Sequence, residues 1–334
     1  MRRAVWAVVA AAALAFAVAR AADDPFLERI WLQYNFVPGD RIVFAEDFAS
    51  ADSTAVLARF DGAAGAARVE SWSGERVLRV ERSAALAVGM NEALAPNFTI
   101  EFDLGLSKGA IELASAGAEG DDASRSRVRW TESSGALLLG DGTTKGGSFA
   151  PAAEPHHVSL MVEGSRARLW VDGAELCDVP NSNIARTNLL RFQINPGGGD
   201  PIRLGALRIA TISRPLLAAR LKVEPTVIVH GLTWSGDALR PESAPTLRWL
   251  VDALRQDQAL RLRLTVHADG AEGAGSALFA TVRRAKNLEA YLRSRGGIGP
   301  QQVTVEGKGN QHPQLAPNTP EGRWSNLRVE ISTL

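Results

Sequence analysis

The sequence is poor in cysteine, the residue that builds disulfides and thiolate metal sites, and it has no excess of basic residues over acidic ones. Its 334 residues include a single cysteine, Cys177, which excludes an intramolecular disulfide and leaves stability to core packing. Acidic and basic residues number 37 each, so the chain has no excess positive charge to attract a nucleic acid. It also lacks a phosphate-cradling loop and a G-x-S-x-G motif. We therefore expect no cofactor, and we interpret Cys177 as a small buried hydrophobic residue.

A long apolar stretch occurs near the N-terminus. Arg2 and Arg3 precede the apolar run 4–19, and residues 19–21 form a small-x-small cleavage site. The run is too short for a membrane-spanning helix, so the pattern predicts a secretory signal peptide over residues 1–21. Its removal would take three arginines with it and leave 34 basic residues against 37 acidic ones, which again argues against a nucleic-acid partner.

Residues 41–213 show the pattern of short strands separated by turns. About ten stretches, such as 98–106 and 166–173, alternate apolar and polar residues or form short apolar runs. Asp172-Gly173 is a favoured two-residue turn for a hairpin between two such runs. The pattern predicts an all-β domain of two antiparallel sheets, a sandwich of jelly-roll type, which follows an N-terminal segment over 22–40.

Beyond Pro215 the pattern changes to alternating strands and helices. We expect a linker over 214–224 and an α+β domain over 225–334. One helix is expected over 242–255 and a longer one over 276–297, because apolar residues recur there at helical spacing. The apolar stripe of the longer helix consists of Leu278, Val282, Ala285, Leu288 and Leu292. Four strands are expected beside the helices, over 226–232, 259–267, 302–309 and 325–334.

Several ordered motifs in this second domain resemble those of the OmpA-like peptidoglycan-binding domain. Residues 268–273 stand where that family has its T-D-x-x-G turn, and Arg284-Ala285 stands in its helix motif. Gly307-Lys308-Gly309 matches its G-x-G turn. Residues 318–323 and 326–331 match its two closing motifs, which read N-x-T-x-x-G-R and N-R-R-V-E-I in the family. The resemblance covers about a third of the chain and implies an α+β fold.

The resemblance also implies a ligand, the diaminopimelate of the peptidoglycan stem peptide. The family's motif positions fall on Asp269, Thr281, Arg284, Asn326 and Arg328. Diaminopimelate carries an ammonium and a carboxylate on one carbon, so its site needs one fixed acceptor and one fixed donor. Asp269 suits the ammonium, and the planar guanidinium of Arg284 suits bidentate contact with the carboxylate. The alternative is that Asp269 and Arg284 merely pair with each other or with Arg328.

Five positions depart from the family pattern. Ala277 and Ala280 replace an asparagine and a leucine of the helix, and Thr281 replaces a serine. Ala268 replaces the threonine of the turn, and Leu327 replaces an arginine of the last motif. The fold tolerates these changes, but hydrogen-bonding side chains are lost. One alternative function is therefore a structural interaction protein whose module no longer binds its ligand.

Two clusters contain the side chains that bind metals. His267, Asp269 and Glu272 lie within six positions, but their spacing is not that of a zinc site, so we interpret His267 as a strand-end residue. The acidic stretch 119–122 offers the oxygen ligands that calcium prefers, but we interpret it as a solvated loop. We expect no metal site.

The first domain also resembles a known class. Residues 34–48, together with RLWVDGAEL at 168–176, are similar to the laminin-G or concanavalin-like sandwiches of exported bacterial proteins. Such sandwiches often bind or cleave glycans, which makes Glu101 and Asp103 the best candidates for an enzyme. Glycosidases of this fold carry a third carboxylate where this chain has Gly105. We interpret the two carboxylates as an outward-facing polar pair, and the protein as not an enzyme.

These observations together predict an exported protein of the periplasm, associated with the cell wall, with the outer membrane as an alternative location. Its OmpA-like module would bind peptidoglycan and anchor a sandwich of unknown ligand. A glycan or an outer-membrane protein is a possible partner for the sandwich. The second alternative is a sandwich that binds or cleaves glycans and is held near the wall.

Overall fold

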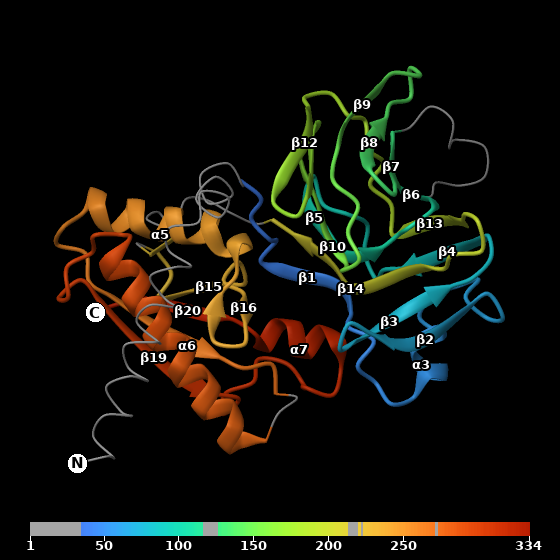
Figure 1. The fold of residues 1–334 in the computed structure, drawn as a ribbon. Coiled ribbons are helices and arrows are strands. Elements are labelled where there is room, and N and C mark those ends of the chain that lie inside the picture. The colour runs from blue at the N-terminus through green and yellow to red at the C-terminus, as the bar shows by residue number, and fades with distance from the viewer. Residues whose placement is uncertain (1–34, 116–125, 213–219, 222, 271–272) are drawn as a thin grey trace, which may run out of the picture.

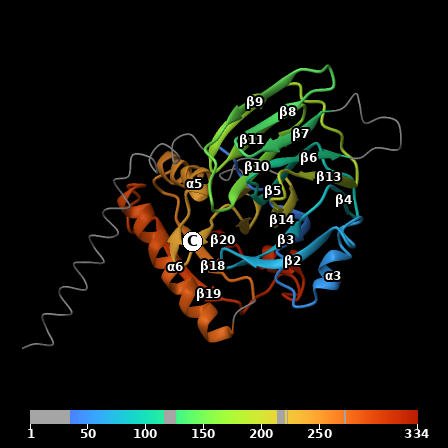
Figure 2. The same ribbon diagram turned by 45° about the vertical axis from the view of Figure 1, so that its right-hand side comes forward.

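The chain forms two domains, a β-sandwich and a smaller α+β module (Figures 1 and 2). A computed structural model describes residues 35–115, 126–212, 220–221, 223–270 and 273–334. The predicted signal peptide, most of the predicted linker and the acidic stretch 119–122 lie outside these ranges. The two-domain fold class predicted from the sequence is confirmed.

The first domain consists of two antiparallel sheets that enclose one hydrophobic core. The larger sheet has the strand order β12-β11-β10-β5-β14-β3-β2, and β1 also pairs with β14. Its strands are β1 (Arg41–Glu46), β2 (Ala67–Trp72), β3 (Glu75–Val80), β5 (Asn97–Gly105), β10 (His156–Glu163), β11 (Arg166–Val171), β12 (Ala174–Val179) and β14 (Ile202–Thr211).

The smaller sheet has the order β4-β13-β6-β7-β8-β9. Its strands are β4 (Ala84–Gly89), β6 (Gly109–Ser115), β7 (Arg127–Thr131), β8 (Ser134–Leu138), β9 (Thr144–Ser148) and β13 (Leu189–Pro196). A short helix, α3 (Ser53–Leu57), begins at Asp52, whose carboxylate accepts the backbone N–H groups of Thr54 and Ala55. The sequence pattern missed β2, β4, β6 and β9, which are short or rich in small and polar residues.

Strand β5 shows how the sequence separates the two faces of the larger sheet. Phe98, Ile100, Phe102 and Leu104 alternate along it and all enter the core between the sheets. The intervening Thr99, Glu101 and Asp103 therefore lie on the outer face. Thr99 and Glu101 are nevertheless buried, because Gly39 of the first described segment donates its backbone N–H to Thr99 and the module faces Glu101.

The predicted hairpin turn is present between β11 and β12. Val171 pairs with Ala174, and both Asp172 and Gly173 have positive φ values, 50° and 79°. Such a turn matches the twist of the flanking strands, and aspartate and glycine tolerate it. Cys177, on β12, is half-buried against the core, less enclosed than the sequence suggested, and its burial raises the pKa of the thiol to about 11.

The module is built on a four-stranded sheet with the order β15-β20-β18-β19, and it has a core of its own. Only the β18–β19 pair is parallel among the described strand pairs. The elements of the module are β15 (Thr226–Val229), β16 (Trp234–Ser235), β17 (Ala238–Leu239), α5 (Ala244–Gln256), β18 (Leu262–His267), α6 (Ala274–Ser294), β19 (Val303–Gly309), α7 (Pro320–Asn326) and β20 (Val329–Thr333).

Helix α6 buries a different face from the one predicted. Ala285, Leu288 and Leu292 are buried as expected, but Leu278 and Val282 are only partly buried. Ala277 and Thr281 occupy the buried face in the first half of the helix. Small residues are needed there because β19 approaches the helix closely, at two glycines described below.

Helix α7 was not predicted, since residues 325–334 were assigned to one strand. Thr319 caps the helix by accepting the backbone N–H of Gly322, and Pro320 occupies its first turn. The strand β20 begins only at Val329. Helix α7 packs against β1 of the sandwich, so it lies at the junction of the two domains (Figure 1).

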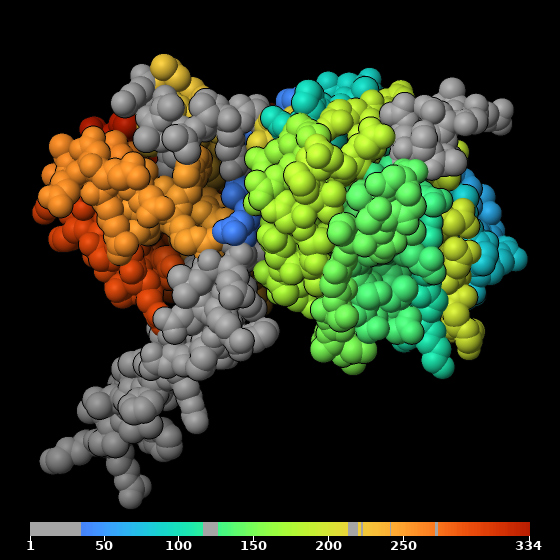
Figure 3. Space-filling model, turned by 90° about the horizontal axis from the view of Figure 1, so that it is seen from above, coloured from blue at the N-terminus to red at the C-terminus, as the bar shows by residue number. Residues whose placement is uncertain are grey.

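The two domains meet along one side of each. Figure 3 shows the module and the sandwich as two masses, with blue residues of the first described segment between them. Phe36, in that segment, packs edge-on against the buried Trp170 of the sandwich. Within the described ranges, no helix is both long and apolar enough to cross a membrane.

Candidate functional site

The turn after β18 carries the first predicted ligand residue, Asp269. The backbone N–H of Ala268 donates to the carbonyl of Gly309 at 2.9 Å, which fixes the start of the turn to β19. Gly270 has a φ of 93°, and a Cβ atom there would come within 2.7 Å of Pro317. Glycine therefore allows both the sharp turn and its close contact with the loop at Pro317. The side chain of Asp269 is partly exposed.

Asn326 lies beneath this turn and is almost completely buried. Its side-chain oxygen accepts the backbone N–H groups of Gln314 and Leu315, at 2.7 and 3.2 Å. Its amide nitrogen donates to the carbonyl of Leu315 at 2.9 Å and, more weakly, to that of Asp269 at 3.5 Å. Asn326 thus connects the end of α7, the loop before it and the Asp269 turn.

Arg284, the second predicted ligand residue, lies on α6 and is partly exposed. Its Nε donates to the carbonyl of Gly236 at 3.1 Å, and its guanidinium lies 5.7 Å from the ring centre of Trp234. Both contacts come from the β16–β17 hairpin, which holds the side chain against its edge. Among the described residues, none accepts a hydrogen bond from the two terminal nitrogens of Arg284.

Thr281 aligns α6 with the end of β18. Its hydroxyl is buried and accepts the backbone N–H of Gly309 at 2.8 Å. A Cβ atom at Gly307 would lie 2.4 Å from the backbone of Thr281, so glycine is required for this close approach. The carbonyl of Gly309 also accepts the backbone N–H of Ala268. Thr281 of α6 and the start of the Asp269 turn therefore both contact Gly309, at the end of β19. Arg284 lies one helical turn beyond Thr281.

Arg328 is buried, and it contacts residues of the module. It donates to the carbonyls of Asn326 and His312, at 3.2 and 2.9 Å, and forms an ion pair with Glu330. His267, the last residue of β18 as predicted, lies 3.5 Å from the same carboxylate. Burial and the nearby Arg328 lower the pKa of His267, so its ring is neutral near pH 7. The described residues contain no group of three potential metal ligands.

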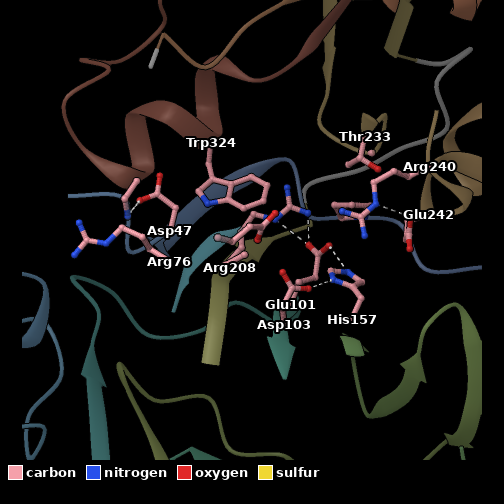
Figure 4. A pocket seen from close by; sticks show the side chains of 15 residues that line it. Asp47, Arg76, Glu101, Asp103, His157, Arg208, Thr233, Arg240, Glu242 and Trp324 are labelled. Atoms are coloured by element: carbon pink, nitrogen blue, oxygen red, sulfur yellow. Dashed lines mark hydrogen bonds and ion pairs between the residues drawn. The ribbon is translucent and has the colours of Figure 1, made fainter. Parts of the chain in front are cut away.

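A second polar cluster lies between the domains, on the outer face of the larger sheet (Figure 4). Glu101 accepts hydrogen bonds from the buried guanidinium of Arg208, with Nε at 2.9 Å. His157 lies between two carboxylates, with Nδ1 2.8 Å from Asp103 and Nε2 3.7 Å from Glu101. Glu101 and Asp103 face outward from the sheet as predicted, but Glu101 is not solvated: it is 7% exposed and paired with Arg208, which lies far away in the sequence.

The charges of this cluster are fixed by their neighbours. Burial raises the pKa of Glu101, but Arg208 and His157 outweigh it, and the pKa lies below its usual range. Burial similarly lowers the pKa of His157, but hydrogen bonds to Asp103 and Glu101 raise it overall to about 10. His157 is consequently protonated at neutral pH, and the cluster is a network of ion pairs.

Helix α7 connects the module to this face of the sandwich. Arg323 donates to both carboxylate oxygens of Asp47, at 2.5 and 2.6 Å. Burial raises the pKa of Asp47, but the bonds from Arg323 outweigh it and lower the pKa overall. Glu321 pairs with Arg59, and the indole of Trp324 lies 4.9 Å from the guanidinium of Arg208. Three residues within four positions of α7 thus contact the sandwich through charged or aromatic side chains.

Comparison with known proteins identifies the module. Residues 235–326 match the model of the OmpA family, which shows an OmpA-like domain in the C-terminal half of the chain. Outer membrane protein A of Bordetella avium is 49% identical over 49 residues, which are 15% of this chain and 25% of that protein. The chain therefore spans only about a quarter of the length of this relative.

Solved structures resemble each domain separately. The cell wall anchor of the T6SS from Pseudomonas aeruginosa is 26% identical over 36% of this chain and 94% of its own, with a TM-score of 0.30. The carbohydrate recognition domain of Emp46p in its potassium-bound form is 11% identical over 54% of this chain and all of its own, with a TM-score of 0.38.

Proposed function

We propose that the module binds peptidoglycan through the diaminopimelate of the stem peptide, and so anchors the sandwich to the cell wall. The match of residues 235–326 to the OmpA family supports binding of peptidoglycan in general. The diaminopimelate contact rests on one observation. Asp269 and Arg284 stand at the family's motif positions, one in the turn after β18 and one on α6. Hydrogen bonds of Ala268 and Thr281 to the same residue, Gly309, hold this turn and this helix side by side.

Each of the two side chains has a distinct task in this proposal. Asp269 accepts the ligand's ammonium, from a turn that Asn326 and Pro317 hold in place. Arg284 donates from its terminal nitrogens to the ligand's carboxylate, while its Nε stays bound to Gly236. This division preorganises one acceptor and one donor before the ligand arrives, which reduces the entropy lost on binding.

The other three predicted residues act as supports in this proposal. Thr281, Asn326 and Arg328 are each at most 3% exposed, and each bonds to the backbone of the loops and strands around the site. We assign them to positioning of Asp269 and of the loop 312–317. Their loss would weaken binding through disorder of the turn, with a fall in the thermal stability of the module as well.

We infer that the protein is a binding protein and not a glycosidase. A general acid for glycoside cleavage needs a pKa near the operating pH, so that it carries a proton and can release it. His157 has a pKa of about 10 and is engaged by two carboxylates, and Glu101 stays ionised beside Arg208. Neither group suits proton transfer near pH 7.

Co-sedimentation with purified sacculi of the diaminopimelate type tests the proposed function. The full-length protein should pellet with sacculi, and Asp269→Ala or Arg284→Ala should each weaken binding about ten- to a hundredfold, since a charged hydrogen bond contributes roughly 1.5–3 kcal/mol. Arg293→Ala is the matched control, because Arg293 lies on the same helix and pairs with Glu289 on its exposed surface.

Two outcomes would contradict the proposal. If the wild-type protein does not pellet, the module has lost its ligand, as its departures from the family pattern allow, and the protein acts through other contacts. If both variants pellet like the wild type, the site lies elsewhere in the module. We propose a periplasmic, wall-associated location on the same grounds, and fractionation of cells before and after wall digestion tests it.

A further inference from the structure

Two cavities between the domains join into one groove along the outer face of the larger sheet. Their volumes are about 460 and 160 Å³, and together they are in the range of a ligand site. Five charged residues line both cavities and so form the middle of the groove, namely Glu75, Asp103, His157, Arg240 and Glu242. Trp324 lines only the larger cavity, and Trp72 lines only the smaller one.

Both domains contribute walls to this groove. Glu101, Asp103 and His157 come from β5 and β10 of the sandwich, whereas Trp324 and Arg240 come from α7 and the loop after β17 of the module (Figure 4). The groove therefore exists only where the two domains are docked. Figure 4 shows Trp324 above the charged cluster of the sandwich, with Arg240 and Glu242 at one side.

A break in the regular strand shapes the floor of the groove. Gly205 pairs with Asp103 and Arg208 pairs with Glu101, so Ala206 and Leu207 together stand opposite the single residue between them. Ala206 has a φ of 44°, which is unusual for a residue with a side chain. This β-bulge directs Arg208 onto Glu101, and bulges of this kind are frequent beside binding sites.

A glycine opens the other end of the groove. A Cβ atom at Gly105 would lie 2.5 Å from the indole of Trp72, so glycine allows that ring to lie directly on β5. The guanidinium of Arg203 lies 5.0 Å from the centre of the same ring. In the larger cavity, the guanidinium of Arg208 likewise lies beside the ring of Trp324. Each cavity thus has one indole in contact with an arginine.

Most carboxylates of the groove are paired, whereas Glu75, Glu154 and the guanidinium of Arg76 line it without an ion pair to a described residue. Glu101 bonds Arg208, Asp103 bonds His157, Glu242 pairs with Arg240, and Asp47 pairs with Arg323. A charged ligand that binds at one of these pairs would have to compete with it and leave a partly buried charge uncompensated, which is costly. A neutral ligand can instead bond to the remaining lone pairs and N–H groups of both partners.

We propose that this groove binds a neutral oligosaccharide. A pyranose ring has one face of C–H groups that packs on an indole, and a rim of hydroxyls that bonds carboxylates and guanidiniums. Two indoles with a row of charged side chains between them, most of them paired, match a short chain of such rings. The proposal does not depend on peptidoglycan binding by Asp269 and Arg284, because none of the groove's lining residues belongs to that site.

Calorimetric titration of the full-length protein tests this proposal. The probes are a tetrasaccharide of N-acetylglucosamine, a β-linked glucose tetrasaccharide, and a tetramer of galacturonate as the charged counterpart. Binding of either neutral tetrasaccharide is expected, and the more tightly bound one identifies the source as an acetylated wall-type glycan or a plain glucan. The galacturonate tetramer should bind at least about tenfold more weakly, because its carboxylates oppose those of the groove.

Variants of the two indoles locate the site. Trp72→Ala and Trp324→Ala should each weaken binding about tenfold or more, as expected for the loss of a stacked ring. Trp324→Phe keeps an aromatic ring at the domain junction and should bind with an intermediate affinity, which separates loss of contact from loss of docking. Phe279→Ala, an exposed aromatic of α6 that lines neither cavity, is the control and should bind like the wild type.

Three results would overturn the proposal. They are no binding of either neutral tetrasaccharide, equal binding of the galacturonate tetramer, and neutral binding that survives both tryptophan variants. The Asp269→Ala/Arg284→Ala protein should keep its full affinity for the tetrasaccharide. Failure of wall binding and failure of groove binding are therefore distinguishable in the same set of proteins.

Discussion

The Asp269–Arg284 site and the groove between the domains are built in opposite ways. Asp269 and Arg284 lie fifteen positions apart, in one turn and one helix of a single domain. The groove combines residues from position 38 to position 324, and from both domains. The first site is partly exposed, whereas the second lies between the domains and has most of its carboxylates in ion pairs.

This difference explains which site a sequence reveals. Residues that act together and lie close along the chain leave an ordered motif, which survives here despite five departures from the family pattern. Residues that meet only after two domains dock leave no such motif. Glu101 and Asp103 looked like one more solvated pair on a strand, because nothing near them in the sequence indicates Arg208 or Trp324.

The largest expected effect concerns the ligand of the exposed site. Replacing the diaminopimelate of a soluble stem peptide by lysine removes the carboxylate that Arg284 is proposed to hold. Affinity for the wild-type protein should fall about ten- to a hundredfold. The Arg284→Ala variant should bind both peptides equally weakly, because the partner of that carboxylate is already gone. Fluorescence anisotropy of labelled peptides measures both effects, and full discrimination by the variant would disprove the contact.

A second prediction concerns the ion pair that joins the domains. Asp47→Ala leaves the partly buried Arg323 without its bidentate partner, so the protein should lose about 2 kcal/mol of stability. The control is Asp178→Ala, because its partner Arg166 is 53% exposed, and that change should cost less than about 1 kcal/mol. Urea unfolding of both variants compares the two pairs, and equal losses would show that the junction is no stronger than the surface.

A third prediction is that the enclosed cluster weakens in alkali. The pKa of His157 is raised to about 10, and an unfolded histidine has a pKa of about 6.5. Its contribution to stability is therefore complete below about pH 6.5 and is lost as the pH rises through about 10. Between pH 7 and 10 the melting temperature should fall by roughly 5 °C more in the wild type than in His157→Gln. Parallel melting curves across this range would contradict the assignment.

The smallest expected effect concerns the one thiol, which belongs to neither site. Cys177 is half-buried and its pKa is raised to about 11, so little of it is thiolate at neutral pH. It should react with a thiol reagent at pH 7 far more slowly than free cysteine, and Cys177→Ser should cost less than about 1 kcal/mol. Tetrasaccharide and sacculus binding should be unaffected by that substitution. A change in tetrasaccharide binding or in sacculus binding would mean that the conformation of β12 affects one of the two sites.

Local patterns predicted the elements whose burial is one-sided. Strand β5 alternates cleanly, Asp172-Gly173 specifies its hairpin, and the C-terminal half of α6 has its apolar stripe. The buried face of the first half of α6 was predicted wrongly. It consists of Ala277, Ala280 and Thr281, small residues that hydrophobic periodicity does not count. They are buried because two glycines of β19 bring the strand within contact of the helix backbone.

Helix α7 was not predicted for another reason. Seven residues are too few for a periodic pattern, and the helix is stabilised by its cap at Thr319 and by ion pairs to the sandwich. Those partners, Asp47 and Arg59, lie more than 250 positions earlier in the chain. The predicted domain limits, 41–213 and 225–334, stay a prediction.

The order of strands within each sheet governs how the chain can be completed. β14 lies between β5 and β3, and β20 lies between β15 and β18, although each is the last described strand of its domain in sequence. During synthesis, most strands of a domain therefore leave the ribosome before the strand that pairs with them in the middle of the sheet. Until then the larger sheet consists of two separate groups of strands and the unpaired β1, and their open edges are prone to pair with other chains. Fragments that stop before Ile202 should accumulate as aggregates, and those that extend past Thr211 should stay dispersed.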